Sequence, residues 1–303
     1  TKVKVMSKFV NALGFLTIVK IPKKYILQKD QIADSLICFP AIGLIVGLIL
    51  SVFYCAVSFF LPVVLSVVLL VVLEVVITGG AHLDGLSDMF DGTFSGSSDK
   101  NKILGIMKKS DVGVYGILAI VFLLILKIST IYYLANVANS NTIINYSSYV
   151  DLKHVLTFYL TIIFMPAFGR WSMVYLIGRY KNARGSGSLA KVFTDSKDRR
   201  KNFYISSIYL FLLFLISYTF FGYYSGSNVG SFGFLNNLEG VYLVLFVLTK
   251  ALLVTAALFL LLFPVSWFFT RRIGGITGDI TGGVSEIVEL LFLFVNYLVF
   301  TFI

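Results

Sequence analysis

Residues Glu74–Gly92 read EVVITGGAHLDGLSDMFDG and lead directly from a strongly apolar run into the most acidic patch of the chain. Asp84, Asp88 and Asp91 are spaced so that on a helix their carboxylates project from one face. Like charges this close repel one another unless a positive group lies between them, and carboxylate oxygens are ligands that Mg²⁺ prefers. We therefore predict a Mg²⁺ site here, although a solvated loop is the simpler alternative. The expected metal ligands are Glu74, Asp84, Asp88 and Asp91, and the expected catalytic residues are His82, Asp84, Asp88 and Asp91.

The composition indicates an integral membrane protein. The chain has 303 residues, of which 58% are hydrophobic and 13% are charged, and its mean hydropathy is +0.90. Soluble globular domains carry about 25% charged residues. We therefore predict an all-α, polytopic protein in the lipid bilayer, because helices satisfy their own backbone hydrogen bonds there.

Apolar runs separated by polar segments predict a single membrane domain, residues 1–303, with about seven transmembrane helices. Gly43 and Gly47, in the first of these, form a small-xxx-small pair that favours close helix packing. Cys38 and Cys55 lie too far apart along the same helix to form a disulfide. The expected spans, within a bundle of residues 36–303, are 36–61, 62–78, 113–135, 154–178, 203–224, 241–269 and 285–303.

Residues 1–35 precede the bundle as a basic segment. Lys2, Lys4 and Lys8 flank apolar residues at helical spacing, which is typical of an amphipathic helix on the cytoplasmic membrane surface. The segment has no short apolar core followed by small residues, so we expect no cleavable signal peptide.

The lysines and arginines indicate the orientation of the chain. Of 25 such residues, 21 fall in segments that seven spans place on one side. The positive-inside rule assigns that side, with its active-site loops, to the cytoplasm. The net charge of +10 thus reflects membrane orientation, and we expect no nucleic-acid partner. The segments are 1–35, 79–112, 179–201 and 270–284.

Two further regions carry candidate substrate-binding residues. Lys108 and Ser110 stand beside two glycines, where cations and a close backbone approach suit a phosphate. An ordinary membrane boundary with glycines for helix packing explains them equally well. Arg170 lies inside an apolar span, so it requires a partner or a polar cavity; we interpret it as functional. Orientation alone is enough to explain the nearby cations, Arg179, Lys181 and Arg184.

The segment Arg271–Glu289 reads RRIGGITGDITGGVSEIVE and contains five glycines. A glycine-rich backbone can cradle phosphate, and its three acidic residues have the spacing of one helical face. An ordinary glycine-rich turn is the alternative, but it leaves Glu286 and Glu289 in an apolar span unexplained. The candidate substrate-binding residues of this segment are Arg271, Gly275, Thr277, Asp279 and Glu286.

The sequence shows no zinc-ligand spacing of Cys and His, no P-loop, no dinucleotide fingerprint and no serine nucleophile elbow. Carboxylates, cations and glycines at a membrane edge suit metal-assisted transfer at a phosphate or pyrophosphate.

Thr78–Gly92 carries the pattern T-G-G-x-H-x-D-G-L-x-D-x-x-D-G, which resembles the signature of cobalamin synthase, the adenosylcobinamide-GDP ribazoletransferase family. The similarity extends over nearly the whole chain. One departure occurs where the family leads us to expect an acidic residue at 109 and a basic one at 111, because this chain has Lys109 and Asp111. The other matching stretches are Phe15–Thr17 with Phe39, Pro40 and Gly43; Met107–Gly116; and Gly274–Asp279 with Glu286 and Glu289.

This resemblance implies a Mg²⁺-dependent phosphotransferase of late cobalamin biosynthesis in the inner, cytoplasmic membrane of a prokaryotic cell. Such an enzyme joins adenosylcobinamide-GDP to α-ribazole or its 5′-phosphate, giving adenosylcobalamin or its 5′-phosphate, and releases GMP. In our hypothesis the carboxylates hold Mg²⁺ on the pyrophosphate, one of them or His82 accepts the hydroxyl proton, and Arg170 or Lys108 stabilises GMP. A second copy of the chain and other enzymes of the pathway are the protein partners to be expected.

Two rival functions stay open. A CDP-alcohol phosphotransferase also combines aspartate-rich helices with Mg²⁺, but its motif is expected to begin D-G-x-x-A-R, and Ser87-Asp88 occupies that place here. An ion-coupled transporter also places carboxylates in a membrane cavity. It more often shows an internal repeat with broken spans, and the sequence has no convincing repeat.

Overall fold

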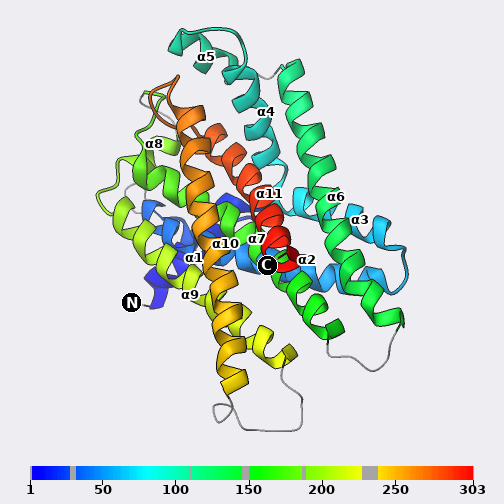
Figure 1. Ribbon diagram of the computed structural model, residues 1–303. Helices are drawn as coiled ribbons and strands as arrows, with labels where there is room; N and C mark the ends of the chain where they lie inside the picture. Colours follow the sequence, from blue (N-terminus) through cyan, green and yellow to red (C-terminus); the bar gives the residue numbers. More distant parts are fainter. Residues whose placement is uncertain are drawn as a thin grey trace.

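The computed structural model describes residues 2–27, 32–109, 111–144, 150–185, 189–226 and 238–302. The regular structure of these residues is helical (Figure 1), apart from one isolated bridge between Asn182 and Ile276. The prediction of an all-α chain is therefore confirmed. The helices are α1 (Lys2–Leu16), η1 (Lys23–Tyr25), η2 (Ile32–Cys38), α2 (Phe39–Ser58), α3 (Val63–Thr78), α4 (Ala81–Thr93), α5 (Lys100–Ile106), α6 (Val114–Ile144), α7 (Val150–Arg179), α8 (Leu189–Thr194), α9 (Arg199–Gly226), α10 (Leu238–Thr270) and α11 (Gly278–Phe302).

Within the described residues, six helical segments are long and apolar enough to cross a bilayer. The pair α3 and α4 passes the same test only when both are taken together, because the chain bends by 88° between them. Counting this pair as one broken span gives seven, which agrees with the predicted number. The six segments are Ile32–Ser58, Val114–Ala138, His154–Arg179, Arg199–Phe221, Val244–Thr270 and Gly278–Val299.

The bend between α3 and α4 arises from two consecutive glycines. Gly79 and Gly80 have φ angles of 64° and 70°, a left-handed conformation that only glycine adopts without strain. The N–H of Gly80 donates to the carbonyl of Val75 at 2.9 Å and closes the end of α3. Where the sequence led us to expect a cytoplasmic loop, residues 79–112, the structure has two helices, and α4 packs against α11 and α6.

Helix α7 is the central helix of the bundle, because it packs against α2, α6, α9 and α11. The predicted close packing at Gly43 and Gly47 of α2 is confirmed. A Cβ atom on Gly43 would lie 2.5 Å from the Cα of Ala167, and one on Gly47 would lie 2.7 Å from the Cα of Ile163. The two glycines therefore let the backbone of α2 approach that of α7.

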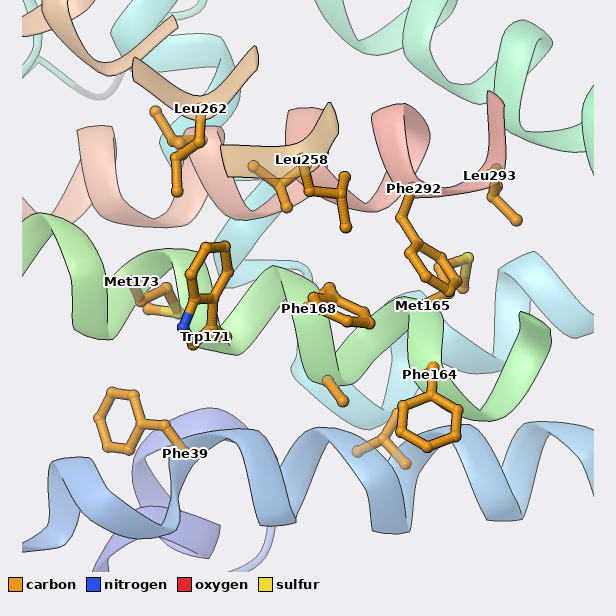
Figure 2. Close-up of a cluster of buried hydrophobic side chains, with 14 of the residues drawn as sticks. Phe39, Phe164, Met165, Phe168, Trp171, Met173, Leu258, Leu262, Phe292 and Leu293 are labelled. Atoms are coloured by element: carbon orange, nitrogen blue, oxygen red, sulfur yellow. The ribbon is translucent and has the colours of Figure 1, made fainter. Parts of the chain in front are cut away.

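Large apolar side chains surround α7 (Figure 2), where Phe168 and Trp171 lie between α2 and the pair α10 and α11. The ring of Phe168 stacks on Phe292 of α11 with centroids 4.8 Å apart, and Trp171 meets Phe259 of α10 at 4.9 Å. The Nε1–H of Trp171 donates to Ser207 Oγ at 2.9 Å, so its polar atom is satisfied. This packing fixes α11 against the centre of the bundle.

Helix α1 is fastened to the residues that follow it. The Nδ2 of Asn11 donates to the carbonyl of Tyr25 at 2.6 Å, and Lys8 pairs with Asp34 at 3.0 Å. Val5 and Met6 are exposed whereas Ala12 is buried, as in an amphipathic helix. The expected position of this helix on the membrane surface stays a prediction.

Candidate active site

Glycines bring α4 and α11 into contact where the acidic patch lies. A Cβ atom on Gly85 would lie 2.8 Å from the backbone oxygen of Asp279, and one on Gly283 would lie 2.9 Å from the Cα of Leu86. Neither position has room for a larger residue without a backbone shift. The first turn of α11 therefore lies beside α4.

This contact assembles three carboxylates at the surface. Asp84 is exposed, Asp88 and Asp279 are half-buried, and the three charges lie within electrostatic range of one another. One cation balances them in part, because Nη2 of Arg184 donates to Asp279 Oδ2 at 2.6 Å and to the carbonyl of Met107 at 3.2 Å. The arrangement stays net negative and therefore favours a bound cation.

The segment between α10 and α11 holds Asp279 and Arg184 together. Thr277 Oγ1 accepts from the N–H of Ile280 at 3.2 Å, as an N-cap does, and lies 3.3 Å from Asp279 Oδ2. Ile276 exchanges backbone hydrogen bonds of 2.8 Å with residues 181 and 183, which directly precede Arg184. Gly275 permits this pairing, since a Cβ atom there would lie 3.1 Å from the backbone nitrogen of Ala183.

Asp91, the third aspartate of α4, is buried and engaged elsewhere. Its Oδ2 accepts from the N–H of Gly113 at 2.8 Å, and its Oδ1 accepts from the N–H of Gly116 at 2.9 Å. These donors belong to the start of α6, where a helix leaves N–H groups unpaired and favours a negative charge. A Cβ atom on Gly113 would lie 2.8 Å from the Cγ of Asp91. The glycines of this motif thus bring the backbone close to a carboxylate.

Six charged or titratable side chains form a second group inside the bundle, which we call the buried charge cluster. None is more than 6% exposed. Nζ of Lys127 lies 2.8 Å from Glu74 Oε2 and 3.3 Å from Glu286 Oε2. Glu289 contacts both cations, with Lys127 at 2.5 Å and with the guanidinium of Arg170. The members of the cluster are Glu74, His82, Lys127, Arg170, Glu286 and Glu289.

The structure therefore distributes the predicted site residues over three places. Asp84 and Asp88 meet Asp279 at the surface, Asp91 of the same helix lies within electrostatic range of Asp88 but accepts hydrogen bonds from the start of α6, and Glu74 lies in the buried charge cluster. Nδ1 of His82 lies 4.0 Å from Glu286 Oε1 in the same cluster.

The predicted cations are also spread out. Arg170 is fully buried and has the carboxylate partner that a charge in an apolar span requires. Lys108 is exposed. Arg271 is exposed too, with its guanidinium carbon 4.4 Å from the ring centre of Trp267. Ser110 lies outside the described residues. The substrate-binding roles assigned to these residues stay predictions.

Two contributors, Arg184 and Lys127, were not identified as site residues from the sequence, and Glu289 was noted there without an assigned role. Lys127 carried the same signal as Arg170, a charge within an apolar span. Nothing distinguished Arg184 from its basic neighbours, because its pairing with Asp279 joins segments 95 residues apart.

The oxygen atoms of the surface carboxylates are ligands of the kind that Mg²⁺ takes. Among the residues that the structure describes, no three His, Cys, Asp or Glu side chains are grouped to hold a metal ion by themselves. Mg²⁺ usually takes only one or two carboxylates and completes its coordination with water and substrate phosphates. Asp84 and Asp88 offer such oxygens on a face with unbalanced negative charge. They fit a Mg²⁺ that is shared with a phosphorylated substrate.

A comparison of sequences identifies the family. The sequence model described as cobalamin-5-phosphate synthase matches residues 8–297 of this chain. The chain belongs to the cobalamin-5-phosphate synthase family. It is therefore a membrane-embedded transferase of cobalamin biosynthesis, as the sequence motifs led us to expect.

Three relatives named adenosylcobinamide-GDP ribazoletransferase show the extent of the similarity. The protein from a Thermoanaerobacter species is 30% identical over 285 residues, which cover 94% of each chain. The protein from Fusobacterium nucleatum is 30% identical over 304 residues, covering 98% of this chain and 99% of its own. The protein from Alkaliphilus metalliredigens is 36% identical over 209 residues, covering 69% and 74%. No solved structure matches the chain significantly.

Proposed function

We propose that the protein transfers adenosylcobinamide phosphate from adenosylcobinamide-GDP to a ribose hydroxyl of α-ribazole or its 5′-phosphate. The hydroxyl oxygen bonds to the phosphorus that carries the cobinamide, the pyrophosphate bond breaks, GMP leaves, and the hydroxyl proton passes to a base. One observation carries this proposal: Asp84 and Asp88 meet the Asp279–Arg184 pair, in a chain whose relatives are named for this reaction.

The side chains of this surface have complementary roles in the proposal. Asp84 and Asp88 are the accessible carboxylates of α4, so one of them accepts the proton of the attacking hydroxyl. The guanidinium of Arg184 stabilises negative charge on the phosphate that departs. Asp279 orients this guanidinium, because its Oδ2 accepts from Nη2 of Arg184 at 2.6 Å. His82 lies buried behind this surface and supports α4 from the inside.

We propose Mg²⁺ as the cofactor, held by Asp84 and Asp88 together with pyrophosphate oxygens. When bound, the metal neutralises charge on the pyrophosphate. The sequence also predicted Glu74 and Asp91 as metal ligands. One oxygen of Glu74 pairs with Lys127, and both oxygens of Asp91 accept from N–H groups at the start of α6.

The basic segments support a location in the cytoplasmic membrane with this surface facing the cytoplasm. Self-association of the chain, or contact with other enzymes of the pathway, is part of the same proposal.

The test is a single-turnover reaction with purified protein, adenosylcobinamide-GDP and α-ribazole 5′-phosphate, in Mg²⁺ or in EDTA. We expect GMP and the complete corrinoid in equal amounts with Mg²⁺ and neither product with EDTA. Unphosphorylated α-ribazole in a parallel reaction shows which acceptor is preferred. An active relative run alongside controls for the assay. If the relative releases GMP and this protein does not, the proposal is wrong, and CDP-alcohol turnover and ion uptake become the next activities to measure.

A further inference from the structure

Lys127 of α6 is the point at which the buried charge cluster converges. Its ammonium contacts Glu74 of α3 and both Glu286 and Glu289 of α11, and its side chain is 2% exposed. The ammonium donates hydrogen bonds to Glu286 at 3.3 Å and to Glu289 at 2.5 Å, and it forms an ion pair with Glu74 at 2.8 Å. One side chain thus joins three helices that are far apart in the sequence.

Two of the carboxylates that Lys127 contacts lie near the bend between α3 and α4, one in α3 itself and one in α11 beside the start of α4. Glu74 is in the last turn of α3, where its carbonyl accepts from the hydroxyl of Thr78 at 3.1 Å, directly before Gly79 and Gly80. Glu286 belongs to α11, and its Oε1 lies 4.0 Å from Nδ1 of His82, a residue in the first turn of α4. Lys127 therefore contacts Glu74 before the bend directly and reaches the start of α4 only through Glu286.

The cluster is also fixed to the centre of the bundle. Glu289 pairs with Arg170 of α7 and lies against Gly169, where a Cβ atom would be 2.7 Å from the Cγ of Glu289. Because α7 packs against four other helices, this contact fixes the cluster to the centre of the bundle. Asp84 and Asp88 follow His82 within one and two turns.

We infer that Lys127 is a positioning residue for the acidic surface. Through Glu74 and Glu286 it sets the bend, so that Asp84 and Asp88 face Asp279. A buried ion pair adds little net stability relative to apolar packing, whereas its directional contacts specify a geometry. The catalytic consequence depends on the proposed function, but the geometric consequence does not.

The first experiment compares Lys127→Met with Lys102→Met, which removes an exposed lysine outside the cluster. We expect Lys127→Met to lower kcat by about 100-fold, the effect of a displacement near 1 Å at reacting groups. Lys102→Met keeps wild-type kcat. An unchanged kcat per folded Lys127→Met molecule would refute the inference, while absent turnover in the wild type would refute only the proposed function.

A spectroscopic measurement reports on geometry without turnover. Spin labels are placed at Ala81→Cys and Gly278→Cys, two exposed positions at the starts of α4 and α11, with Cys38 and Cys55 changed to Ser. The dipolar coupling between the labels gives the distribution of distances between them. We expect this distribution to be broader in Lys127→Met than in the parent protein and in Lys102→Met. Identical spectra in all three proteins would contradict a positioning role.

Glu74→Gln keeps the inference testable if Lys127→Met does not fold. This isosteric change keeps the volume of the side chain and removes one of three carboxyl groups around two permanent cations, so it should not weaken insertion. We expect normal folding, kcat lowered by about 10-fold and a half-saturating Mg²⁺ concentration within about two-fold of wild type. An unchanged kcat would refute the inference. A large rise in the Mg²⁺ requirement would instead make Glu74 a metal ligand and would also overturn it.

Discussion

The contact between Asp91 and the start of α6 gives a quantitative prediction. The carboxylate accepts from the N–H groups of Gly113 and Gly116, and it occupies the space that a Cβ atom on Gly113 would need. Changing Gly113 to Ala therefore forces the new methyl group against the carboxylate. Changing Asp91 to Ala removes both the hydrogen bonds and the obstacle.

The expected energies follow from these contacts. Hydrogen bonds to a charged group contribute about 1.5–3 kcal/mol each, so Asp91→Ala should lower the free energy of unfolding by about 3 kcal/mol or more. Gly113→Ala should cost about 1–3 kcal/mol, as overpacking does in tightly packed cores. In the double variant the methyl group has room. The double variant should therefore lose as much stability as Asp91→Ala alone. The difference from the sum of the two single variants, which is their coupling energy, should be about 1–3 kcal/mol.

The free energy of unfolding can be measured by SDS titration in mixed micelles, with helicity followed by circular dichroism. Gly105→Ala is the matched control, because a Cβ atom there would meet nothing within 4 Å. We expect this control to be no less stable than the wild type, because Ala favours a helix over Gly.

Two results would refute the reasoning about Asp91. Strictly additive effects in the double variant would mean that the carboxylate does not occupy the space beside Gly113. A stable Asp91→Ala protein whose Mg²⁺ requirement rises as much as that of Asp84→Asn would mean that Asp91 is a metal ligand.

Three further predictions concern the surface and the core. Asp88→Asn should abolish formation of the corrinoid product while the protein still inserts and purifies normally; substantial residual turnover would exclude it as a metal ligand. Arg184→Gln should lower kcat by about 10–100-fold through loss of charge stabilisation of the departing phosphate, with Arg184→Lys intermediate; equal rates for all three proteins would contradict its role. Tyr218→Phe removes a hydroxyl 2.7 Å from Asn296 Nδ2, so it should cost about 0.6–1.7 kcal/mol of stability and leave kcat unchanged. A fall in its kcat would show that this core contact reaches the active site.

Much of the fold could be predicted because lipid allows few solutions. Apolar length and composition were enough for an all-α membrane protein with seven hydrophobic segments, since only helices satisfy the backbone in this setting. The pair Gly43 and Gly47 also predicted a close helix contact correctly, because small residues at that spacing have few other uses. The geometry after Gly79 was not predicted. Two adjacent glycines permit many conformations, and packing against α11 selects one of them.

For the site, the sequence by itself determined the family, the acidic face of α4 and the polar residues of the last span, because each is a local pattern of residue types. Only the tertiary structure decided which of these residues act together. It paired Asp91 with the start of α6 and Glu74 with Lys127, whereas helical spacing alone indicated only that the three aspartates share one face. It also brought Arg184 to Asp279 and placed Lys127 among three glutamates. The physical reason is that a charged residue in an apolar span requires a partner of opposite charge. Which residue becomes that partner depends on which helices pack together.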